Sequence, residues 1–359
     1  MPVKDLSSHV HQDKPLVIGI EFNQAGISTA LVDENARVIA ALQTVTPQRT
    51  TRAAIAAMAQ SILELATSKQ RGDSPIAAIG ISVTGIIDPP TGRVSIPGFK
   101  GWTRVAVREM LIERLDESGH DIRISLRRKQ ARAEASVSAH PAIAIHSRAA
   151  AFAAAESWCG AARGRNNVVY LSVGNDIEAG ILANGRALEG ASGNAGAAGW
   201  LTVGGGFNAE YETSGCLSAE ATINAMTRRA IEAWGGEGSS MLGGLIKADA
   251  SRLDAATILR AAGGGDKLAV KVARDTCHWI GRGVANLISI LNPDALVIGG
   301  ELGVGLKPFL DDIREEARRW AAPEAAKQCR IVSASAGANA GVIGAARLAM
   351  LLLGSKAGN

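Results

Sequence analysis

The stretch LVIGIEFNQAGISTALVDENARVIAAL, residues 16–42, decides the fold. The apolar run at 16–22 predicts a buried strand. Two more strands follow it, and they are joined by a turn at 33–35. A helix with apolar side chains at helical spacing is expected from about Thr51 to Ser68. The buried strand AAIGISVTG and the amphipathic helix Val105–Leu115 complete a β-β-β-α-β-α unit.

A similar order of elements returns in the second half of the chain. It begins with a strand near 143–145 and an alanine-rich helix from about Arg148 to Cys159. The further elements expected from periodicity are strands at 168–174, 179–188 and 295–300, and helices at 218–234, 267–291 and 308–320. Two such units favour a two-lobed α/β protein.

Composition excludes several classes of protein. The 359 residues are 47% hydrophobic and 20% charged, which excludes a disordered or fibrous chain. A net charge of +4 does not by itself indicate a nucleic-acid partner. The 4 cysteines are scattered without a CxxC pair, which suits a reducing cytoplasm. The apolar stretch 340–354 is interrupted by Arg347 and is too short to span a bilayer, so a cytoplasmic protein without membrane contact is expected.

From about residue 16 to 353 the order of segments resembles the ROK family of repressors, open reading frames and sugar kinases. The stretches that carry the resemblance include IGISVTGIIDPPTGRVSIPGFKGW, VVYLSVG, GASGNAGAAGWLTV, GCLSAEATI and LNPDALVIGGEL. The resemblance implies the actin-like ATPase fold, with a βββαβα core in each of two lobes and a cleft between them. The lobes expected are 16–140 with 338–355 and 141–337, preceded by a flexible tail at 1–15.

The phosphate-binding segments of the family kinases are altered in this chain. The family hairpin D-x-G-G-T-K corresponds to a segment that starts at Glu21 and carries Asn23 and Gln24 where phosphate approaches. The second family loop, G-T-G-I-G-A-G, is Gly174-Asn175-Asp176-Ile177-Glu178-Ala179-Gly180, with two carboxylates in place of small residues. Carboxylates there oppose a triphosphate. The adenosine-side turn keeps Gly299 and Gly300.

The catalytic base of the family kinases has no counterpart here. The family has an Asn-Asp pair at the start of the alanine-rich helix, and the Asp accepts the sugar hydroxyl proton. The corresponding pair is Ser147 and Arg148 in one register, or His146 and Ser147 in another. Arg cannot act as a base, whereas His146 can, although a structural role is the more common one for such a histidine.

The sugar and zinc ligands of the family are also replaced. The residues at the sugar-contact positions are Gly98, Ala197, Trp200 and Ser218. The family's structural zinc, held by a His and a cysteine cluster, corresponds to Trp200, Ala209, Tyr211 and Cys216. One thiolate cannot hold zinc, so no metal is expected.

Two further features bear on partners. The basic run from Arg123 to Arg132 is either a contact for an anion, a nucleic acid or a partner protein or, more simply, a solvated face, because no aromatic side chains lie between the charges. Family repressors place a winged helix-turn-helix before the first hairpin, whereas fewer than twenty residues precede Leu16. Sequence-specific DNA binding by that route is not expected.

These replacements together predict a ROK-like pseudokinase without a cofactor. It would be a regulatory protein that senses an unknown small molecule or binds a protein partner, and it would form a homodimer. One alternative is an ATP-dependent hexose or N-acetylhexosamine kinase, or another enzyme, with a rebuilt site that uses His146, Asp176 or Glu178. Another is a structural subunit with a closed cleft. Arg148 is expected at the floor of the cleft, paired with Asp176 or Glu178, or else with an anionic ligand.

Overall fold

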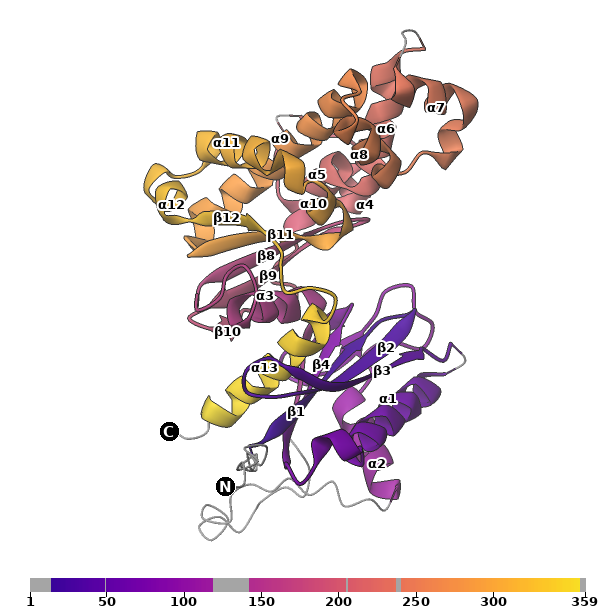
Figure 1. Cartoon of the computed structure of the whole chain (residues 1–359), viewed down its shortest axis with the longest axis vertical. Coiled ribbons are helices and arrows are strands. Elements are labelled where there is room, and N and C mark those ends of the chain that lie inside the picture. The colour runs from indigo at the N-terminus through magenta and orange to yellow at the C-terminus, as the bar shows by residue number, and fades with distance from the viewer. Residues whose placement is uncertain (1–13, 49, 119–141, 205, 237–239, 356–359) are drawn as a thin grey trace, which may run out of the picture. The chain divides into compact units, whose positions relative to one another are not determined.

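The computed structural model describes residues 14–48, 50–118, 142–204, 206–236 and 240–355, which form two compact units (Figure 1). Unit 1 comprises Met1–Ala151 and Asn339–Asn359, and unit 2 comprises Phe152–Ala338. The basic run 123–132 and most of the expected tail lie outside the described residues.

Unit 1 is built on a five-stranded sheet with the strand order β3-β2-β1-β4-β7. The strands are β1 (Leu16–Phe22), β2 (Gly26–Val32), β3 (Val38–Val45), β4 (Ile76–Val83) and β7 (Ala142–Ser147). The pairs β1–β2 and β2–β3 are antiparallel, whereas β1–β4 and β4–β7 are parallel. A small two-stranded sheet adds β5 (Ile86–Ile87) and β6 (Val94–Ser95). The carboxyl ends of β1, β4 and β7 therefore meet at one edge.

Helices cover both faces of this sheet. Side chains alternate between the faces of a strand, and Ile18, Ile20 and Phe22 of β1 pack on the side of α1 (Thr51–Ala66) and α2 (Val107–Glu117). The opposite face carries α13 (Ala340–Ser355), which returns from the far end of the chain (Figure 1).

Glycines allow α13 to lie directly on the sheet. A Cβ on Gly19 would lie 1.9 Å from Val342 O, and a Cβ on Gly80 would lie 1.9 Å from Ala345 O. Gly19 and Gly80 are paired across β1 and β4. The helix backbone thus occupies the space that side chains would need in this row.

Unit 2 has a second five-stranded sheet with the order β10-β9-β8-β11-β12. Its strands are β8 (Val168–Val173), β9 (Ile177–Ala183), β10 (Arg186–Ala187), β11 (Ala295–Gly299) and β12 (Arg330–Ser333). The helices are α3 (Arg148–Trp158), which begins in unit 1, then α4 (Tyr211–Ser214), α5 (Cys216–Ala221), α6 (Ile223–Trp234), α7 (Met241–Asp249), α8 (Ala255–Gly263), α9 (Lys267–Leu291), α10 (Gly300–Gly305), α11 (Leu310–Trp320) and α12 (Pro323–Gln328).

The core of unit 2 forms around α9. Val169, Leu171 and Val173 of β8 face a layer that contains the apolar side of α9. On the other face of the sheet, Tyr170 stacks against Phe152 of α3, with ring centroids 5.2 Å apart. No helix among the described residues is long and apolar enough to cross a bilayer.

Several elements differ from the sequence expectation. The helix expected at 218–234 is two helices, because Thr222 leaves the helical conformation and its side chain caps α6 at Ala225 N. The strand expected at 179–188 turns at Asn184 and Gly185, which both have positive φ. The helix expected from residue 308 begins at Leu310, since residues 307–309 form a 3-10 turn with Pro308. The helices α7, α8 and α12 were not anticipated.

We predict that Gly80→Ala destabilises unit 1 by about 2 kcal/mol or more, because the added methyl group overlaps the α13 backbone. Denaturant unfolding followed by circular dichroism measures the change. Gly244→Ala in α7 is the control, since nothing lies within 4 Å of its added Cβ and alanine favours a helix. Equal stability of the two variants would contradict the close seating of α13.

Candidate functional site

A row of polar residues crosses the carboxyl edge of the unit 1 sheet. Glu21 of β1 is paired with Ser82 of β4, and Ser82 is paired with His146 of β7. Paired residues of neighbouring strands point to the same face, and the preceding row on this face contains Gly19 and Gly80. The polar row therefore lies on the face covered by α13. In open α/β sheets this edge is where ligands bind.

Glu21 stands between the start of α13 and Arg148. A Cβ on Gly341, in the first turn of α13, would lie 2.0 Å from Glu21 Oε2. A carboxylate is favoured at a helix N-terminus. Burial raises the pKa of Glu21 above its ordinary value, and the positive charge of Arg148 opposes this rise. Glu21 is thus a partly desolvated carboxyl group held by charges of its own unit.

Ser82 contributes a hydroxyl group at the centre of the row. Its side chain is fully buried, and no described residue forms a hydrogen bond with Ser82 Oγ. Buried hydroxyl groups normally have a partner. The row therefore keeps the capacity for one more hydrogen bond.

In one of the two registers expected for the family's base position, a helix cap is followed by a cation. Ser147 Oγ accepts a hydrogen bond from Ala150 N at 3.2 Å, and Arg148 is the first residue of α3. Ser147 Oγ is therefore engaged as the helix cap. The carboxylate whose charge interacts with Arg148 in unit 1 is Glu21. The expected pairing with Asp176 or Glu178, which belong to unit 2, stays a prediction.

Asn23 closes the hairpin between β1 and β2. Its Oδ1 accepts hydrogen bonds from Ala25 N at 2.8 Å and from Gly26 N at 3.0 Å. The carbonyl of Asn23 accepts a hydrogen bond from Thr46 Oγ1 at 2.7 Å. The sequence suggested that Asn23 would project towards phosphate. Instead its side chain folds back and uses the backbone donors of the turn.

Gln24 and Gly98 come together at the same hairpin. Gln24 Nε2 donates to Pro97 O at 3.5 Å, and it lies 3.9 Å from the position of a Cβ on Gly98. Gly98 has φ 74, a conformation that favours glycine. The structure thus brings together one expected nucleotide residue and one expected sugar residue.

The second hairpin, in unit 2, carries its carboxylates in different positions. Asp176 is exposed in the turn, where its carbonyl accepts a hydrogen bond from Gly174 N at 3.0 Å. Glu178 is half-buried in β9, in one row with Ser172 and Gly299. Glu178 and Gly299 therefore share a face at the carboxyl edge of this sheet, whereas Asp176 lies beyond it.

Tyr170 occupies the glycine turn after β11. A Cβ on Gly299 would lie 2.1 Å from the Tyr170 hydroxyl oxygen, which accepts a hydrogen bond from Gly300 N at 3.2 Å. Gly300 has φ 78, and an added Cβ would lie 2.5 Å from Val173 O. The turn needs both glycines for close packing, and one of its backbone donors is used internally.

Ala197 and Trp200 are exposed on a rigid turn of unit 2. Two glycines seat the turn on its neighbours: a Cβ on Gly196 would lie 1.9 Å from Ala179 O of β9, and a Cβ on Gly199 would lie 2.1 Å from Ser218 Oγ of α5. The indole of Trp200 is 57% exposed. Ala197 and Trp200, two of the residues expected as sugar contacts, therefore offer an apolar surface, whereas Ser218 is buried.

The residues at the zinc positions do not fit the metal. Cys216 is buried, and its Sγ accepts a hydrogen bond from Val203 N at 3.5 Å. No group of three His, Cys, Asp or Glu side chains in the described residues could hold a metal ion. The tetrahedral set that zinc requires is missing.

A hydrogen-bond network holds this segment. The Tyr211 hydroxyl donates to Glu220 Oε1 at 2.7 Å, and this bond raises the pKa of Tyr211 above its ordinary value. Arg229 of α6 contacts Glu220 Oε2 at 3.4 Å and donates to Thr276 Oγ1 at 3.0 Å. Arg228 also reaches Glu210, at 3.0 Å. The network joins the segment to α6 and α9.

The ROK family model matches residues 132–351. The chain belongs to the ROK family. A glucokinase of Halalkalibacterium halodurans is 32% identical over 191 residues, which are 53% of this chain and 58% of that protein. A glucokinase of Thermotoga maritima is 25% identical over 335 residues, 92% of this chain and 96% of that protein. The N-acetylglucosamine repressor of Escherichia coli O157:H7 is 25% identical and covers 82% of this chain and 66% of its own length.

Solved structures confirm the fold of this ROK protein. The ROK hexokinase from Thermus thermophilus superposes with a TM-score of 0.73 at 24% identity, covering 95% of this chain and 99% of that one. The expected actin-like ATPase fold is thus correct.

Several site residues were missed by sequence reasoning. Ser82 lies inside an apolar strand, and Tyr170 and Glu220 look like ordinary core and helix residues in the sequence. Only the strand register places Ser82 beside Glu21 and His146. A sequence motif covers one segment of the chain, so it does not reveal residues that strand pairing brings together.

We predict that wild type becomes less stable as pH rises and that Glu21→Gln abolishes the part of this loss that comes from Glu21. A carboxyl group with a raised folded-state pKa stabilises the fold below its unfolded-state pKa, and this stability is lost as pH rises through the folded-state pKa. As pH rises above the unfolded-state pKa of a glutamate, about 4.3, wild type should therefore lose stability relative to Glu21→Gln. Thermal unfolding over this rise in pH measures the difference, with Glu113→Gln on α2 as the exposed charge-removal control. A constant difference between wild type and Glu21→Gln would contradict the desolvation of Glu21.

We predict that Glu220→Ala lowers the stability of unit 2 by about 2 kcal/mol or more, since it leaves the half-buried Arg229 without its carboxylate. Glu212→Ala on the exposed side of α4 should have little effect. A chelator should leave the melting temperature of wild type unchanged. A chelator-induced drop would mean that a metal holds this segment.

Proposed function

We propose that this ROK protein is a pseudokinase, a non-catalytic regulatory protein that senses a small ligand or binds a partner. The observation that carries the proposal is the closed hairpin at Asn23. In the family kinases this hairpin offers backbone N–H groups to ATP phosphates. Here Asn23 Oδ1 takes the N–H groups of Ala25 and Gly26.

Phosphate binding would have to break these bonds. A phosphate can accept hydrogen bonds from these two N–H groups only if it displaces the Asn23 side-chain oxygen. The half-buried amide oxygen would then lack hydrogen-bond donors, which costs free energy. Gln24 adds bulk on the same hairpin, where it reaches Pro97. Asp176 and Glu178 add negative charge to the second hairpin. Together these features weaken ATP binding.

The charges in unit 1 also oppose phosphoryl transfer. Transfer from ATP needs a carboxylate or an equivalent base near the attacking hydroxyl, and Arg148 is permanently protonated. The nearby Glu21 is engaged electrostatically with this guanidinium. A carboxylate held in this way is less available to a metal ion or a sugar hydroxyl.

The proposed ligand is a small sugar or sugar-like molecule. The relatives include proteins named glucokinase and N-acetylglucosamine repressor, which supports a sugar as the first class to test. The replacement of hydrogen-bonding residues by Ala197 and Trp200 favours a ligand that presents an apolar ring face. A homodimer remains part of the proposal on family likeness alone, because the apolar face of α9 is used in the core.

An ATP-dependent sugar kinase is the second candidate. The near full-length match to a glucokinase favours it, and Gly174, Gly299 and Gly300 keep the family glycines. In this alternative His146, Asp176 or Glu178 supplies the working group.

Calorimetry distinguishes the two functions. We predict no micromolar binding of ATP–Mg²⁺ to wild type, and a rise in melting temperature with glucose, N-acetylglucosamine or xylose that ATP–Mg²⁺ does not increase. Asn23→Gly frees both hairpin donors and should strengthen ATP–Mg²⁺ binding, whereas Asn35→Gly in the neighbouring turn serves as the control. A micromolar Kd for ATP–Mg²⁺ in wild type would contradict the proposal and favour the kinase.

A further inference from the structure

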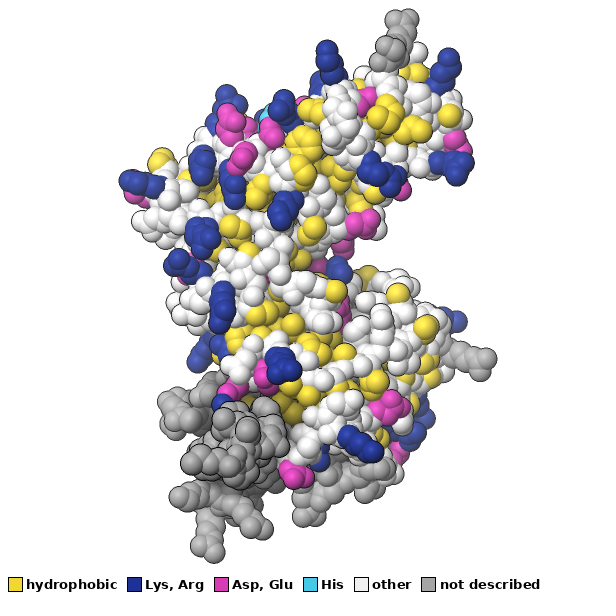
Figure 2. Space-filling view, viewed as in Figure 1, with side chains coloured by type: hydrophobic (Ala, Val, Ile, Leu, Met, Phe, Trp, Pro, Cys, Tyr) yellow, Lys and Arg dark blue, Asp and Glu magenta, His cyan; other side chains and the backbone are white. Residues whose placement is uncertain are grey.

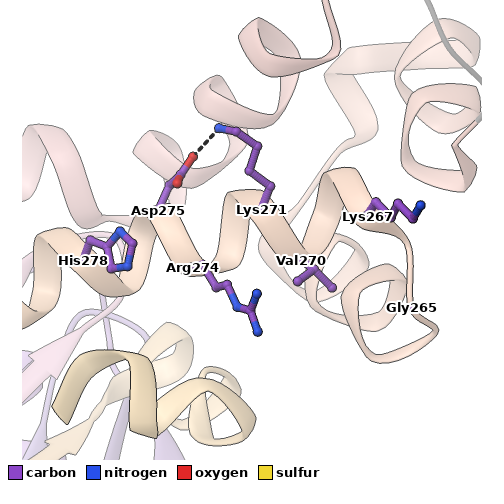
Figure 3. Close-up of a pocket in the computed structure, with 7 residues that line it drawn as sticks. All are labelled: Gly265, Lys267, Val270, Lys271, Arg274, Asp275 and His278. Carbon is purple, nitrogen blue, oxygen red and sulfur yellow. Dashed lines mark hydrogen bonds and ion pairs between the residues drawn. The ribbon is translucent and has the colours of Figure 1, made fainter. Parts of the chain in front are cut away.

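The outer side of α9 carries a line of exposed basic side chains. Lys267, Lys271, Arg274 and His278 are all exposed, and we refer to these four residues as the basic ridge (Figure 3). The other positions of α9 from 268 to 277 are buried or half-buried. Every exposed position from 267 to 278 is therefore a lysine, an arginine or a histidine.

The basic ridge borders an open hollow of about 500 Å³, which is also lined by Gly265, Val270 and Asp275. Gly265 has φ 84, and nothing lies within 4 Å of a Cβ placed there. The end of the hollow at Gly265 is thus open.

The charges of the ridge are only partly neutralised. Lys271 pairs with Asp275 at 2.6 Å, and Arg274 pairs with Asp312 of α11 at 3.3 Å. Lys267 forms no ion pair with any residue that the structure describes. All three cationic side chains are largely exposed, so these pairs contribute little to folding. The charged groups of Lys267, Lys271 and Arg274 therefore remain accessible to a partner molecule.

The spacing of the ridge is regular. Its members are four, three and four residues apart, which places them in one line along the helix. With a rise of 1.5 Å per residue, the line is about 16 Å long. The spacing is the same in both directions along α9. A partner helix with acidic side chains at the same spacing could face the ridge in either orientation.

We propose that the basic ridge binds an acidic, helical segment of a partner protein. Four carboxylates at four-three-four spacing would each meet one ridge residue. Complementary charges of this kind set orientation and speed association. The proposal does not depend on the ligand or on the kinase question.

The next turn of α9 offers an apolar contact beyond the ridge. Arg282 lies 4.8 Å from the ring centroid of Trp279 and 5.4 Å from that of Trp320, which is 60% exposed. Glu316 accepts hydrogen bonds from Arg282 and Trp320 at 3.1 and 2.7 Å and fixes this stack. Tryptophan and arginine are frequent at the centres of protein interfaces. An apolar side chain one turn beyond the last carboxylate would contact Trp320.

The surroundings favour a protein over other anions. A nucleic-acid backbone is a continuous line of charge and would meet Asp275 and Asp312 as well as the cations. Figure 2 shows acidic and basic side chains mixed over the α9–α11 side of unit 2. A single small anion would engage only part of a 16 Å line. Separate carboxylates on a helix can match the cations and avoid the acids.

The test uses the full-length protein and a labelled synthetic helix of about 20 residues, rich in Ala and Gln, with Glu at four-three-four spacing and one Leu a turn beyond. We expect fluorescence anisotropy to show binding that weakens about tenfold in Lys267→Glu/Lys271→Glu. The control variant Lys247→Glu/Lys327→Glu makes the same change in net charge at exposed sites on α7 and α12. It should bind the peptide within about twofold of wild type.

The peptide design gives a second comparison. A peptide of the same composition with its four Glu residues adjacent should bind less tightly, and Trp320→Ala should weaken only the peptide that carries Leu. Equal losses in the two double variants, or equal binding of both peptides, would overturn the proposal. Single-stranded DNA with the same charge as the peptide is compared at about 50 and 200 mM salt. If it binds more tightly than the peptide, and this binding is lost in Lys267→Glu/Lys271→Glu, the surface is a nucleic-acid site instead.

Discussion

The close seating of α13 on the unit 1 sheet is the constraint from which the site follows. The helix backbone takes the space above Gly19 and Gly80, so that row can carry no side chains. The row beyond it, at the carboxyl edge, is free for Glu21, Ser82 and His146. Gly341 then lets the Glu21 carboxyl group approach the first turn of α13. Packing of the last helix thus fixes the position and the desolvation of the first polar residue.

Side chains of this protein form hydrogen bonds at positions where the family kinases bind nucleotide or zinc. Asn23 takes the hairpin donors, Tyr170 takes Gly300 N, and Glu220 with Arg229 holds the segment that corresponds to the zinc site. Each replacement satisfies polar groups that would otherwise need a ligand or a metal. These internal contacts are the observations on which the proposed regulatory role rests.

The sequence was sufficient for the fold, but not for the contacts of the candidate site residues. Hydrophobic periodicity located β1 and α9 closely, because each buries one regular face. It missed the break at Thr222, where a side-chain cap interrupts two apolar helices. Motif comparison placed Asn23 on the path of phosphate but did not reveal that its side chain bonds to the backbone of its own turn, since an Asx turn depends on backbone geometry. The interaction of Arg148 with Glu21 joins residues far apart in the chain, and only the strand register brings them together.

The most direct test of the pseudokinase account is sugar-dependent turnover of ATP. Release of ADP from ATP–Mg²⁺ would be followed with glucose, N-acetylglucosamine and xylose, with the protein at micromolar concentration, for wild type and for His146→Ala, Asp176→Asn and Glu178→Gln. The account predicts that ADP release with each sugar equals release without it, in all four proteins. Sugar-dependent ADP release by wild type that disappears in one of these variants would contradict the account and identify a rebuilt catalytic group.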